Sequence, residues 1–291
     1  MIAYHRPESL SEALAIRSSG PTEILAGGTD VYPAKATRAG WGALAHPALL
    51  DISGITNLRG ITSADEGWRI GCLTTWTDLI RADLPPLFRG LREAARTVGG
   101  VQIQNRGTLV GNLCTASPAG DGIPNLLAIG AEVEIVGPAG TRRVSVESFL
   151  TGYRSHACGP DEIVTALVIP RVQGEARGAF RKLGARRYLV ISIVMAAGVL
   201  EVDALGRIVR ARIAIGACSA VARRLPELER RLAGLSVAEA ASAVEPGDVA
   251  GLSPLDDVRA SADYRRDAAL TLTRDLLGAL AVPAERDEVA A

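Results

Sequence analysis

The chain has 291 residues, of which 48% are hydrophobic, and this length and composition are typical of a globular protein of one elaborate domain or two. Basic and acidic residues both number 32, so no net charge is present to attract nucleic acid or an acidic membrane surface, and a role in nucleic-acid binding is disfavoured. Because residues 1–7 lack the apolar run of a signal peptide and the apolar run at 189–200 is about half as long as a membrane span, we expect a cytoplasmic protein without an integral membrane segment.

The first 57 residues predict a small subdomain of one helix and two strands. Ser9-x-x-Glu12 is a capping box, and apolar residues follow it at helical spacing. Short strands are expected at residues 23–26 and 49–52, because each of these apolar runs stops at a turn that contains glycine.

Residues 58–173 predict a second α+β subdomain. The predicted elements are, in order, a strand at 69–73, a helix capped by Thr75-x-x-Asp78, a helix at 87–98, a hairpin of strands at 131–136 and 141–146, and a strand at 161–169. Residues 99–121 differ from the rest, since they are rich in Gly, Asn, Thr and Ser but also contain apolar residues. Their pattern fits neither a solvated linker nor an amphipathic helix.

A short polar stretch at 173–177 predicts a domain boundary. We therefore expect one domain at 1–173, with subdomains at about 1–57 and 58–173, and a C-terminal domain at 178–285. In the C-terminal domain, the pattern predicts strands at 179–184, 190–202 and 208–215, followed by helices at 223–233, 237–244 and 264–280.

Cysteine spacing is a common sequence signal for a metal site. The four cysteines, at positions 72, 114, 158 and 218, form no Cys-x-x-Cys pair and have no neighbouring histidine to complete a metal cage. We expect four buried, reduced thiols, with no zinc or iron-sulfur cluster on this chain.

The first candidate binding segment is a strand that runs into a double-glycine turn, Ile24-Leu25-Ala26-Gly27-Gly28-Thr29-Asp30-Val31. Glycine has no Cβ and adopts positive φ without strain, so consecutive backbone N–H groups of such a turn can converge on an anion such as a pyrophosphate. A tight turn without a ligand has the same pattern. This segment alone therefore leaves both interpretations open.

The second candidate segment, residues 105–121, carries short hydrogen-bonding side chains between glycines. Such side chains suit a ribityl-diphosphate chain, and a carboxylate at the end of the segment can accept hydrogen bonds from sugar-like hydroxyls. A buried polar loop that satisfies its own backbone explains the pattern equally well. The candidate residues are Thr108, Gly111, Asn112, Thr115, Ser117 and Asp121.

Neither segment is a dinucleotide-binding fingerprint of the Rossmann kind, because the Gly-x-Gly-x-x-Gly spacing is absent. A Walker loop is absent as well. These absences disfavour the common NAD- and ATP-binding folds.

Together and in this order, the two segments resemble the FAD-binding subunits of the molybdenum hydroxylase family, which includes xanthine dehydrogenase and carbon monoxide dehydrogenase. The resemblance continues through Gly152-Tyr153-Arg154 and through residues 161–170, 180–187 and 260–265, so it covers nearly the whole chain. It implies an α+β fold, with a two-subdomain FAD-binding domain of the molybdopterin dehydrogenase (PCMH-like) type. A C-terminal three-stranded antiparallel sheet with helices is expected to follow.

The resemblance also implies FAD as the cofactor of this chain. Residues 24–31 and the turn from Thr108 to Asn112 would hold its pyrophosphate and adenosine side, and Asp121 would bind the ribityl hydroxyls. Val164 would lie near the flavin, and Lys182 would lie close to the isoalloxazine ring, where a positive charge favours a reduced, anionic flavin. Without the resemblance, a lysine on a half-exposed strand such as Lys182 is usually a solvated surface group, and the alternative for Asp121 is a turn-stabilising residue.

Two positions depart from some xanthine dehydrogenases. Val98 stands where those proteins place an aromatic residue against the flavin, and Tyr188-Leu189-Val190 stands where they carry an acidic cluster. Tyr188 is our candidate for covering one face of the ring, and the alternative is a core or interface tyrosine. The departures disfavour NAD as the final acceptor, which the sequence otherwise leaves open among NAD, quinone, cytochrome and oxygen.

The function that the resemblance implies is electron transfer within a complex. A molybdopterin-binding large subunit would hydroxylate the substrate, and 2Fe-2S clusters of a small subunit would pass electrons to FAD on this chain, in a dimer of heterotrimers. One alternative is a free-standing FAD-dependent oxidase or reductase, which is disfavoured because His5, His46 and His156 all lie outside the candidate segments. Another is a flavin-free scaffold subunit.

Overall fold

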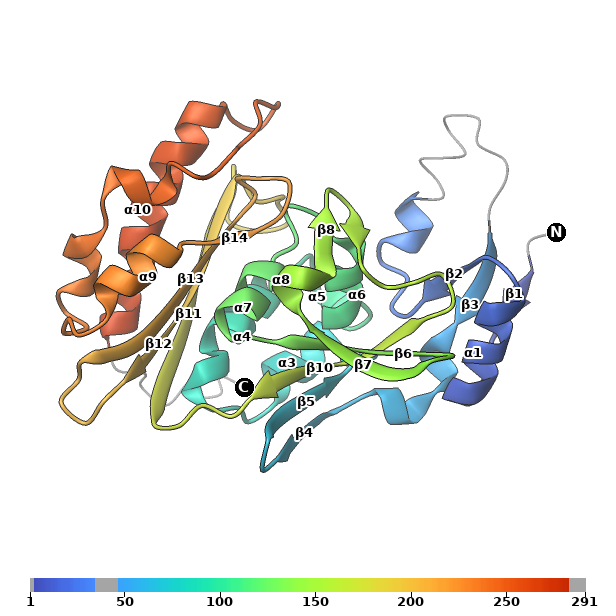
Figure 1. The fold of residues 1–291 in the computed structure, drawn as a ribbon. Helices are drawn as coiled ribbons and strands as arrows, with labels where there is room; N and C mark the ends of the chain where they lie inside the picture. The colour runs from blue at the N-terminus through green and yellow to red at the C-terminus, as the bar shows by residue number, and fades with distance from the viewer. Residues whose placement is uncertain (1–2, 35–46, 283–291) are drawn as a thin grey trace. The chain divides into compact units, whose positions relative to one another are not determined.

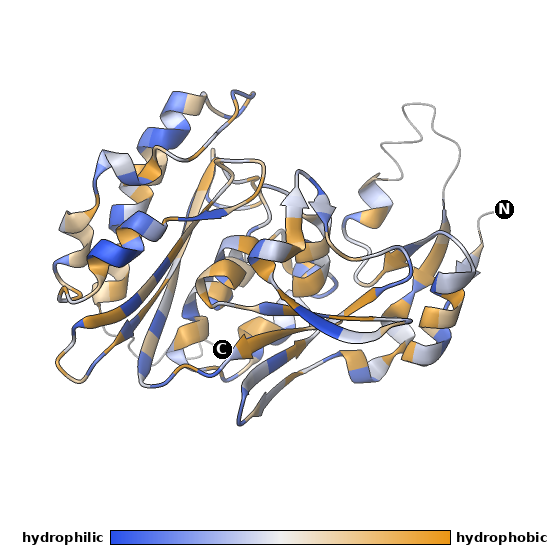
Figure 2. Ribbon diagram, in the orientation of Figure 1, coloured by the Kyte–Doolittle hydropathy of each residue, from blue (hydrophilic) through white to orange (hydrophobic). Residues whose placement is uncertain are grey.

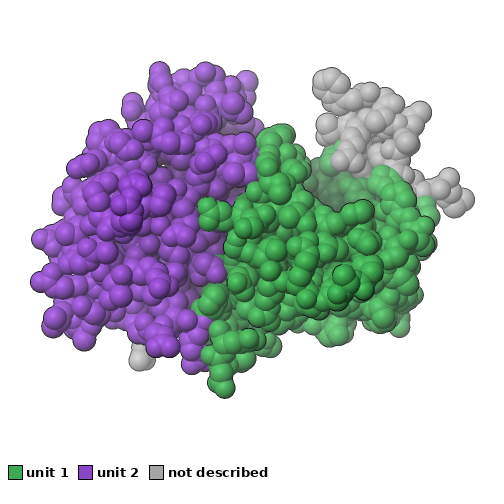
Figure 3. All heavy atoms as spheres, viewed as in Figure 1, with its two compact units in different colours: residues 1–82, 98–116, 131–170 green, residues 83–97, 117–130, 171–291 purple. Residues whose placement is uncertain are grey.

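The structure is a computed structural model that describes residues 3–34 and 47–282, so that His46 lies outside the described residues. The chain forms two compact units (Figure 3). Unit 1 comprises residues 1–82, 98–116 and 131–170, and unit 2 comprises residues 83–97, 117–130 and 171–291. Both units are discontinuous in sequence. The domain boundary at 173–177 therefore stays a prediction about how the chain divides into domains.

Unit 1 is a mixture of short helices and three sheets (Figure 1). The sheets have the strand orders β1-β3-β2, β4-β5-β10-β6-β7 and β8-β9, and only the first is parallel. The helices and strands are β1 (Tyr4–His5), α1 (Leu10–Ser19), β2 (Thr22–Leu25), β3 (Ala48–Asp51), β4 (Ile61–Ala64), β5 (Gly67–Gly71), α3 (Trp76–Arg81), α5 (Val101–Gln104), α6 (Leu109–Thr115), β6 (Glu132–Gly137), β7 (Gly140–Ser145), α8 (Val146–Phe149), β8 (Leu150–Gly152), β9 (Ser155–His156) and β10 (Ile163–Pro170).

The helix starts in unit 1 follow the capping signals of the sequence. The hydroxyl of Thr75 accepts from the N–H of Asp78 at 3.2 Å, and the Asp78 carboxylate accepts from the N–H of Thr75 at 2.9 Å, so the capping box of α3 forms completely. Ser9 also caps α1, but the carboxylate of Glu12 accepts from the N–H of Glu8 instead of the N–H of Ser9. Half of that predicted capping box is therefore present.

Strand β10 forms the centre of the five-stranded sheet. All of its residues are buried except Pro170, and Figure 2 shows the strand as hydrophobic along most of its length. It pairs with β5 on one side and β6 on the other, and its pairing with β6 contains a register shift between Val164 and Ala166. The predicted hairpin of β6 and β7 is present. Strand β4 and helices α5 and α6 were not predicted, because such short segments carry little periodicity. The expectation that residues 99–121 contain no amphipathic helix is wrong for α6, which buries Leu109, Val110 and Leu113.

Unit 2 is built on an antiparallel sheet with the strand order β11-β12-β13-β14. The three predicted strands are present, and the two-residue strand β14 joins them at one edge. The elements of unit 2 are α4 (Arg89–Thr97), α7 (Gly122–Ala128), β11 (Glu175–Leu183), β12 (Val194–Val202), β13 (Ile208–Gly216), β14 (Arg223–Arg224), α9 (Pro226–Leu232) and α10 (Ala262–Ala281).

Two predicted helices of unit 2 need correction. The helix expected from residue 223 begins only at Pro226, because Arg223 and Arg224 pair with β13 as a strand. The helix expected at 237–244 is a single 3-10 turn, Ala240–Ala243. Strand pairing with β13 overrides the helical pattern in the first segment, and packing of Ala240 and Val244 into the hydrophobic core overrides it in the second.

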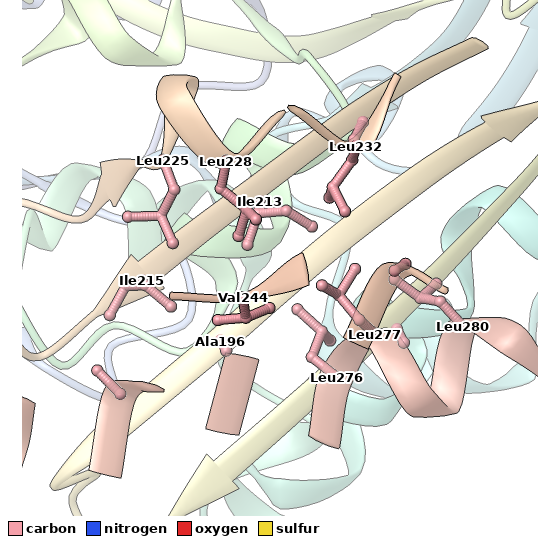
Figure 4. Packing of buried hydrophobic residues seen from close by; sticks show 14 of the residues in the cluster. Ala196, Ile213, Ile215, Leu225, Leu228, Leu232, Val244, Leu276, Leu277 and Leu280 are labelled. Atoms are coloured by element: carbon pink, nitrogen blue, oxygen red, sulfur yellow. The ribbon is translucent and has the colours of Figure 1, made fainter. Parts of the chain in front are cut away.

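The sheet of unit 2 is covered on both faces, so all nine residues of β12 are buried. On one face, Leu276, Leu277 and Leu280 of α10 pack over Ala196 and Ile213 (Figure 4). On the other face, the Nε of Arg212 in β13 donates to the carbonyl of Ala128, at the end of α7, at 2.7 Å. Helices α4 and α7 therefore belong to unit 2, although they come from the N-terminal half of the chain.

Within residues 3–34 and 47–282, no helix is both long enough and apolar enough to cross a bilayer.

Candidate functional site

The two glycine segments of the sequence lie against each other within unit 1. A Cβ on Gly27 would stand 1.9 Å from the carbonyl oxygen of Arg106, and a Cβ on Gly107 would stand 3.3 Å from the Oγ1 of Thr29. Only a residue without a side chain allows the backbone at Gly27 to pass so close to another backbone. The two segments, which are remote in the chain, are therefore in direct contact.

The loop after β2 exposes backbone N–H groups at the start of a helical turn. Gly28 has a φ of 76°, and the N–H of Tyr32 donates to the carbonyl of Gly28 at 3.3 Å. A helical turn that begins in this way leaves the first N–H groups, those of Thr29, Asp30 and Val31, without intrahelical acceptors. Such N–H groups, together with the positive end of a helical turn, attract an anionic group.

Arg154 approaches the same loop from a third segment of unit 1. Its guanidinium lies 3.6 Å from the carboxylate of Asp30, with both side chains about half exposed, and its N–H donates to the carbonyl of Ala116 at 3.1 Å. No partner was predicted for either charged side chain. Arg154 thus connects Ala116, in the second candidate segment, with Asp30 in the turn of the first candidate segment.

Helix α6 begins at the second glycine segment with a hydroxyl cap. The Oγ1 of Thr108 accepts from the N–H of Gly111 at 3.0 Å, and the Oγ1 of Thr115 donates to the carbonyl of Gly111 at 3.0 Å. A Cβ on Gly111 would stand 2.8 Å from the Thr108 Oγ1, so a side chain at this position would shift the hydroxyl. A capping hydroxyl keeps its own O–H, and Thr108 can therefore still donate to an oxygen.

Unit 2 contains a buried cluster of three polar side chains. Asp121 stands at the start of α7, Lys182 lies near the end of β11, and Ser192 precedes β12. The Nζ of Lys182 lies 2.6 Å from the Oδ2 of Asp121, and the Oγ of Ser192 donates to the Oδ1 of Asp121 at 2.8 Å. The Nδ2 of Asn125 donates to the backbone carbonyl of Asp121 at 3.1 Å.

The side chains of Lys182 and Asp121 are only 10% and 8% exposed, so Lys182 is not a solvated surface lysine. Burial raises the pKa of Asp121 above that of an ordinary aspartate, although the charge of Lys182 and the hydrogen bonds act in the opposite direction. Asp121 and Lys182 were both predicted as site residues, but their mutual ion pair was not. Ser192 was missed altogether, and a single serine after an apolar isoleucine gives no sequence signal.

The other predicted site residues have different surroundings. The Oγ of Ser117 accepts from the N–H of Ala119 at 3.3 Å, as expected for a polar loop that satisfies its own backbone. Val164 is buried in β10 next to the register shift. Tyr188 is 59% exposed, with the guanidinium of Arg187 5.2 Å from its ring centroid, so it is not a core tyrosine.

Among the described residues, four that are not glycine have a left-handed φ: Ala116, Arg154, Leu189 and Ala217. Each position borders a candidate segment, since Ala116 follows Thr115, Arg154 contacts Asp30 and Ala116, and Leu189 follows Tyr188. The N–H of Ala217 donates to the carbonyl of Pro118 at 2.8 Å. A left-handed non-glycine residue costs about 1 kcal/mol or more, and such residues concentrate at functional sites.

The cysteines take no part in either cluster. All four are free, but Cys114 and Cys158 are only half-buried, so the expectation that all four are buried is wrong for those two. Burial raises the pKa of Cys72 to about 12 and those of Cys158 and Cys218 to about 11, which keeps these thiols protonated at neutral pH. Within the ranges 3–34 and 47–282, no group of His, Cys, Asp and Glu is arranged to hold a metal ion.

Comparison with protein families gives matches to both halves of the chain. Residues 1–172 match the family described as the FAD binding domain in molybdopterin dehydrogenase, and residues 179–280 match the CO dehydrogenase flavoprotein C-terminal domain. The first match alone covers more than half of the 291 residues.

Individual relatives extend over nearly the full length. The xanthine dehydrogenase FAD-binding subunit of Escherichia coli O157:H7 is 29% identical over 280 residues, which is 94% of both chains. The nicotine 6-hydroxylase medium subunit of Paenarthrobacter nicotinovorans is 30% identical over 278 residues, covering 94% of this chain and 95% of the relative.

Among solved structures, a chain of the reconstituted CO dehydrogenase from Oligotropha carboxidovorans is similar in fold. It superposes with a TM-score of 0.87 at 28% identity, and the match covers 98% of this chain and 99% of that one. The predicted α+β fold, with a C-terminal sheet and helices after the FAD-binding domain, is confirmed. The chain belongs to the family of FAD-binding flavoprotein subunits of the xanthine and carbon monoxide dehydrogenase type of oxidoreductase.

Proposed function

We propose that this chain is the electron-transfer subunit of a cytoplasmic molybdenum hydroxylase, which takes electrons from 2Fe-2S clusters of a partner subunit and passes them to an external acceptor. FAD, when bound, supplies a carrier that accepts and releases electrons singly or in pairs. The observation that carries the proposal is the contact between the two glycine segments in a chain whose relatives are FAD-binding subunits over nearly their full length.

The donor set of unit 1 fits a diphosphate. The first N–H groups of the turn after β2, the hydroxyl of Thr108 and the guanidinium of Arg154 all donate hydrogen bonds or carry positive charge. We assign the pyrophosphate and adenosine side of FAD to these segments, whose residues are Ile24, Leu25, Ala26, Gly27, Gly28, Thr29, Asp30, Val31, Thr108, Gly111, Asn112 and Thr115.

The cluster of unit 2 fits the other half of FAD by its chemistry. A carboxylate accepts hydrogen bonds from ribityl hydroxyls, and a buried ammonium stabilises negative charge on a reduced ring. We assign the ribityl side to Asp121 and Ser117, and the ring side to Lys182 and Tyr188, with Val164 as a further ring contact. In this assignment Asp121 also positions Lys182, because its Oδ2 accepts a hydrogen bond from the Lys182 ammonium.

The partners in this proposal are a molybdopterin-binding large subunit and a 2Fe-2S small subunit, in a dimer of heterotrimers. Support comes from the relatives, several of which are called medium subunits or medium chains. Such a name implies a larger and a smaller companion. The chain itself would then need no substrate pocket, and its residues only have to bind, orient and shield the cofactor.

The experiment is purification of the tagged chain from its native cells, followed by flavin and metal analysis of the complex. We expect FAD in a one-to-one ratio with the chain, and molybdenum and iron on companion subunits. Reduction of the flavin by the substrate of the large subunit should then stop when the iron-sulfur subunit is removed. A chain that purifies alone with FAD and oxidises a small substrate unaided would contradict the proposal.

A further inference from the structure

Arg265 is a buried arginine of unit 2 that the proposed function does not use. It lies in the first turn of α10, and the residue is only 4% exposed. Its Nη1 donates to the backbone carbonyls of Ile193 and Ala217, and its Nη2 lies 2.7 Å from a carboxylate oxygen of Asp257. Burying a guanidinium is costly, and replacing a whole buried ion pair by apolar residues of similar volume is often neutral or stabilising. The contacts of Arg265 join two separate backbone segments.

Both carbonyls belong to segments that contact Asp121 or the loop leading to it. Ile193 directly follows Ser192, whose hydroxyl donates to the Oδ1 of Asp121 at 2.8 Å. The N–H of Ala217 donates to the carbonyl of Pro118 at 2.8 Å, in the loop that leads to Asp121. One guanidinium thus connects the two segments between which Asp121 is fixed.

The backbone at Ala217 needs such support. Its φ of 62° is left-handed, a conformation that a residue with a Cβ keeps only when its surroundings enforce it. The hydrogen bonds of Ala217 to Arg265 and Pro118 are the contacts that do so. The pKa of Asp257 is about 2, because hydrogen bonds from the Arg259 backbone and from Arg265 outweigh the effect of burial, so the anion opposite Arg265 stays charged.

We propose that Arg265 is a positioning residue of the FAD site, which acts from α10 through Ser192 and the 117–121 loop to hold Asp121 and Lys182 in the arrangement that meets the cofactor. This inference rests on the proposed function, since it assumes that Asp121 and Lys182 contact FAD. Lysine is a poor substitute at this position, because one ammonium cannot reproduce a planar fork that serves two carbonyls and a carboxylate.

The test compares Arg265→Met and Arg265→Lys with Arg274→Met and Arg274→Lys. Arg274 is a matched control on the same helix, because its Nη2 also donates to a backbone carbonyl, that of Val244, at 3.0 Å. In the purified complex, we expect Arg265→Met to weaken FAD binding about tenfold, the equivalent of one charged hydrogen bond, and Arg265→Lys to weaken it less. The Arg274 variants should leave the FAD dissociation constant and the visible spectrum of the bound flavin unchanged.

A second measurement needs no cofactor. Hydrogen exchange of the full chain should show reduced protection of the Ala217 amide in Arg265→Lys but not in Arg274→Lys, at equal Tm. A merely structural arginine would lower Tm without this local change. In a double-mutant cycle, Arg265→Lys and Ser192→Ala should affect FAD binding non-additively, because both act on Asp121.

The outcomes distinguish a failure of the Arg265 inference from a failure of the proposed function. If the wild-type complex binds FAD but the Arg265 variants bind it equally tightly, Arg265 is only structural and this inference is wrong. If the wild-type complex takes up no FAD, the proposed function fails and this inference fails with it. If Arg265→Met does not fold, Arg265→Lys and Arg274→Lys give the same comparison.

Discussion

At the scale of single residues, the candidate site depends on positions where no side chain fits. Gly27 faces the Arg106 carbonyl at a distance that excludes a Cβ, and a Cβ on Gly107 would stand only 3.0 Å from the carbonyl oxygen of Ile103. These contacts could not be read from the sequence, because a Gly-Gly-Thr turn looks the same whether it packs against a second loop or against water. The sequence therefore identifies these glycines as candidate residues, but it does not show which contacts require a residue without a side chain.

Gly27→Ala should disrupt the contact between the two glycine segments. The new Cβ would stand 1.9 Å from the Arg106 oxygen, so the loops must separate, at a cost of about 2 kcal/mol in the free energy of unfolding. Gly20→Ala is the control, because nothing lies within 4 Å of its Cβ and its φ of 164° is extended. Urea unfolding and FAD titration of both variants measure the effect. Equal stability and equal FAD affinity of the two variants would contradict the assignment.

Lys182→Met should destabilise the protein in a pH-dependent way. Without the ammonium, Asp121 keeps a carboxylate buried without its cation, so its folded-state pKa rises further above the ordinary value. A carboxyl group with a raised folded-state pKa binds its proton more tightly in the folded state than in the unfolded state. The resulting stabilisation is fully present below the unfolded-state pKa of about 4 and is lost as the pH rises. We expect a small cost at pH 4 and about 3 kcal/mol at neutral pH.

The control for this prediction is the double variant Lys182→Met with Asp121→Asn. It removes the unpaired carboxylate, so the pH dependence that Lys182→Met adds to the free energy of unfolding between pH 4 and 8 should disappear. Denaturant unfolding across this range measures both variants. A cost of Lys182→Met that is the same at every pH would show that the ion pair is not intact.

At the scale of elements, the fold of unit 2 follows from strand β12 and helix α10. Both were predicted from the sequence, because β12 is a long apolar run and α10 has apolar residues at helical spacing. Short elements were predicted less well. Strand β14 and the 3-10 turn Ala240–Ala243 replace parts of predicted helices, because contacts with β13 and with the core decide such segments rather than local preference.

Leu276→Ala should show how much α10 contributes to unit 2. Leu276 is fully buried, and its Cδ2 would be 3.0 Å from a Cβ on Gly198 of β12. Removing it leaves a cavity over the sheet and should cost about 3 kcal/mol in the free energy of unfolding. Leu255→Ala, at a leucine that is 73% exposed, should change stability by less than about 0.5 kcal/mol. Denaturant unfolding compares the two; equal costs would mean that α10 is not packed as described.

At the scale of the whole molecule, the proposed function predicts that the cofactor stabilises the folded chain. A ligand that binds only the folded state at one hundred times its dissociation constant adds about 2.7 kcal/mol to the free energy of unfolding. Thermal unfolding of the complex with FAD should show this increase. FMN should give a smaller one, because it lacks the second phosphate and the adenosine that we assign to the glycine segments. Equal stabilisation by FMN would contradict that assignment.

The sequence by itself determined the α+β class, the long elements β10, β12 and α10, and the family. Hydrophobic periodicity and glycine motifs are local signals, and both are present in the sequence whatever the chain contacts later. The candidate residues of both clusters could be named for the same reason.

Only the tertiary structure decided which residues meet. The Asp121–Lys182 pair, its hydrogen bond from Ser192, the approach of Arg154 to Asp30 and the placement of α4 and α7 in unit 2 all join residues far apart in the chain. Such contacts leave no spacing pattern in one sequence, because folding closes loops of very different lengths when it brings polar groups to their partners.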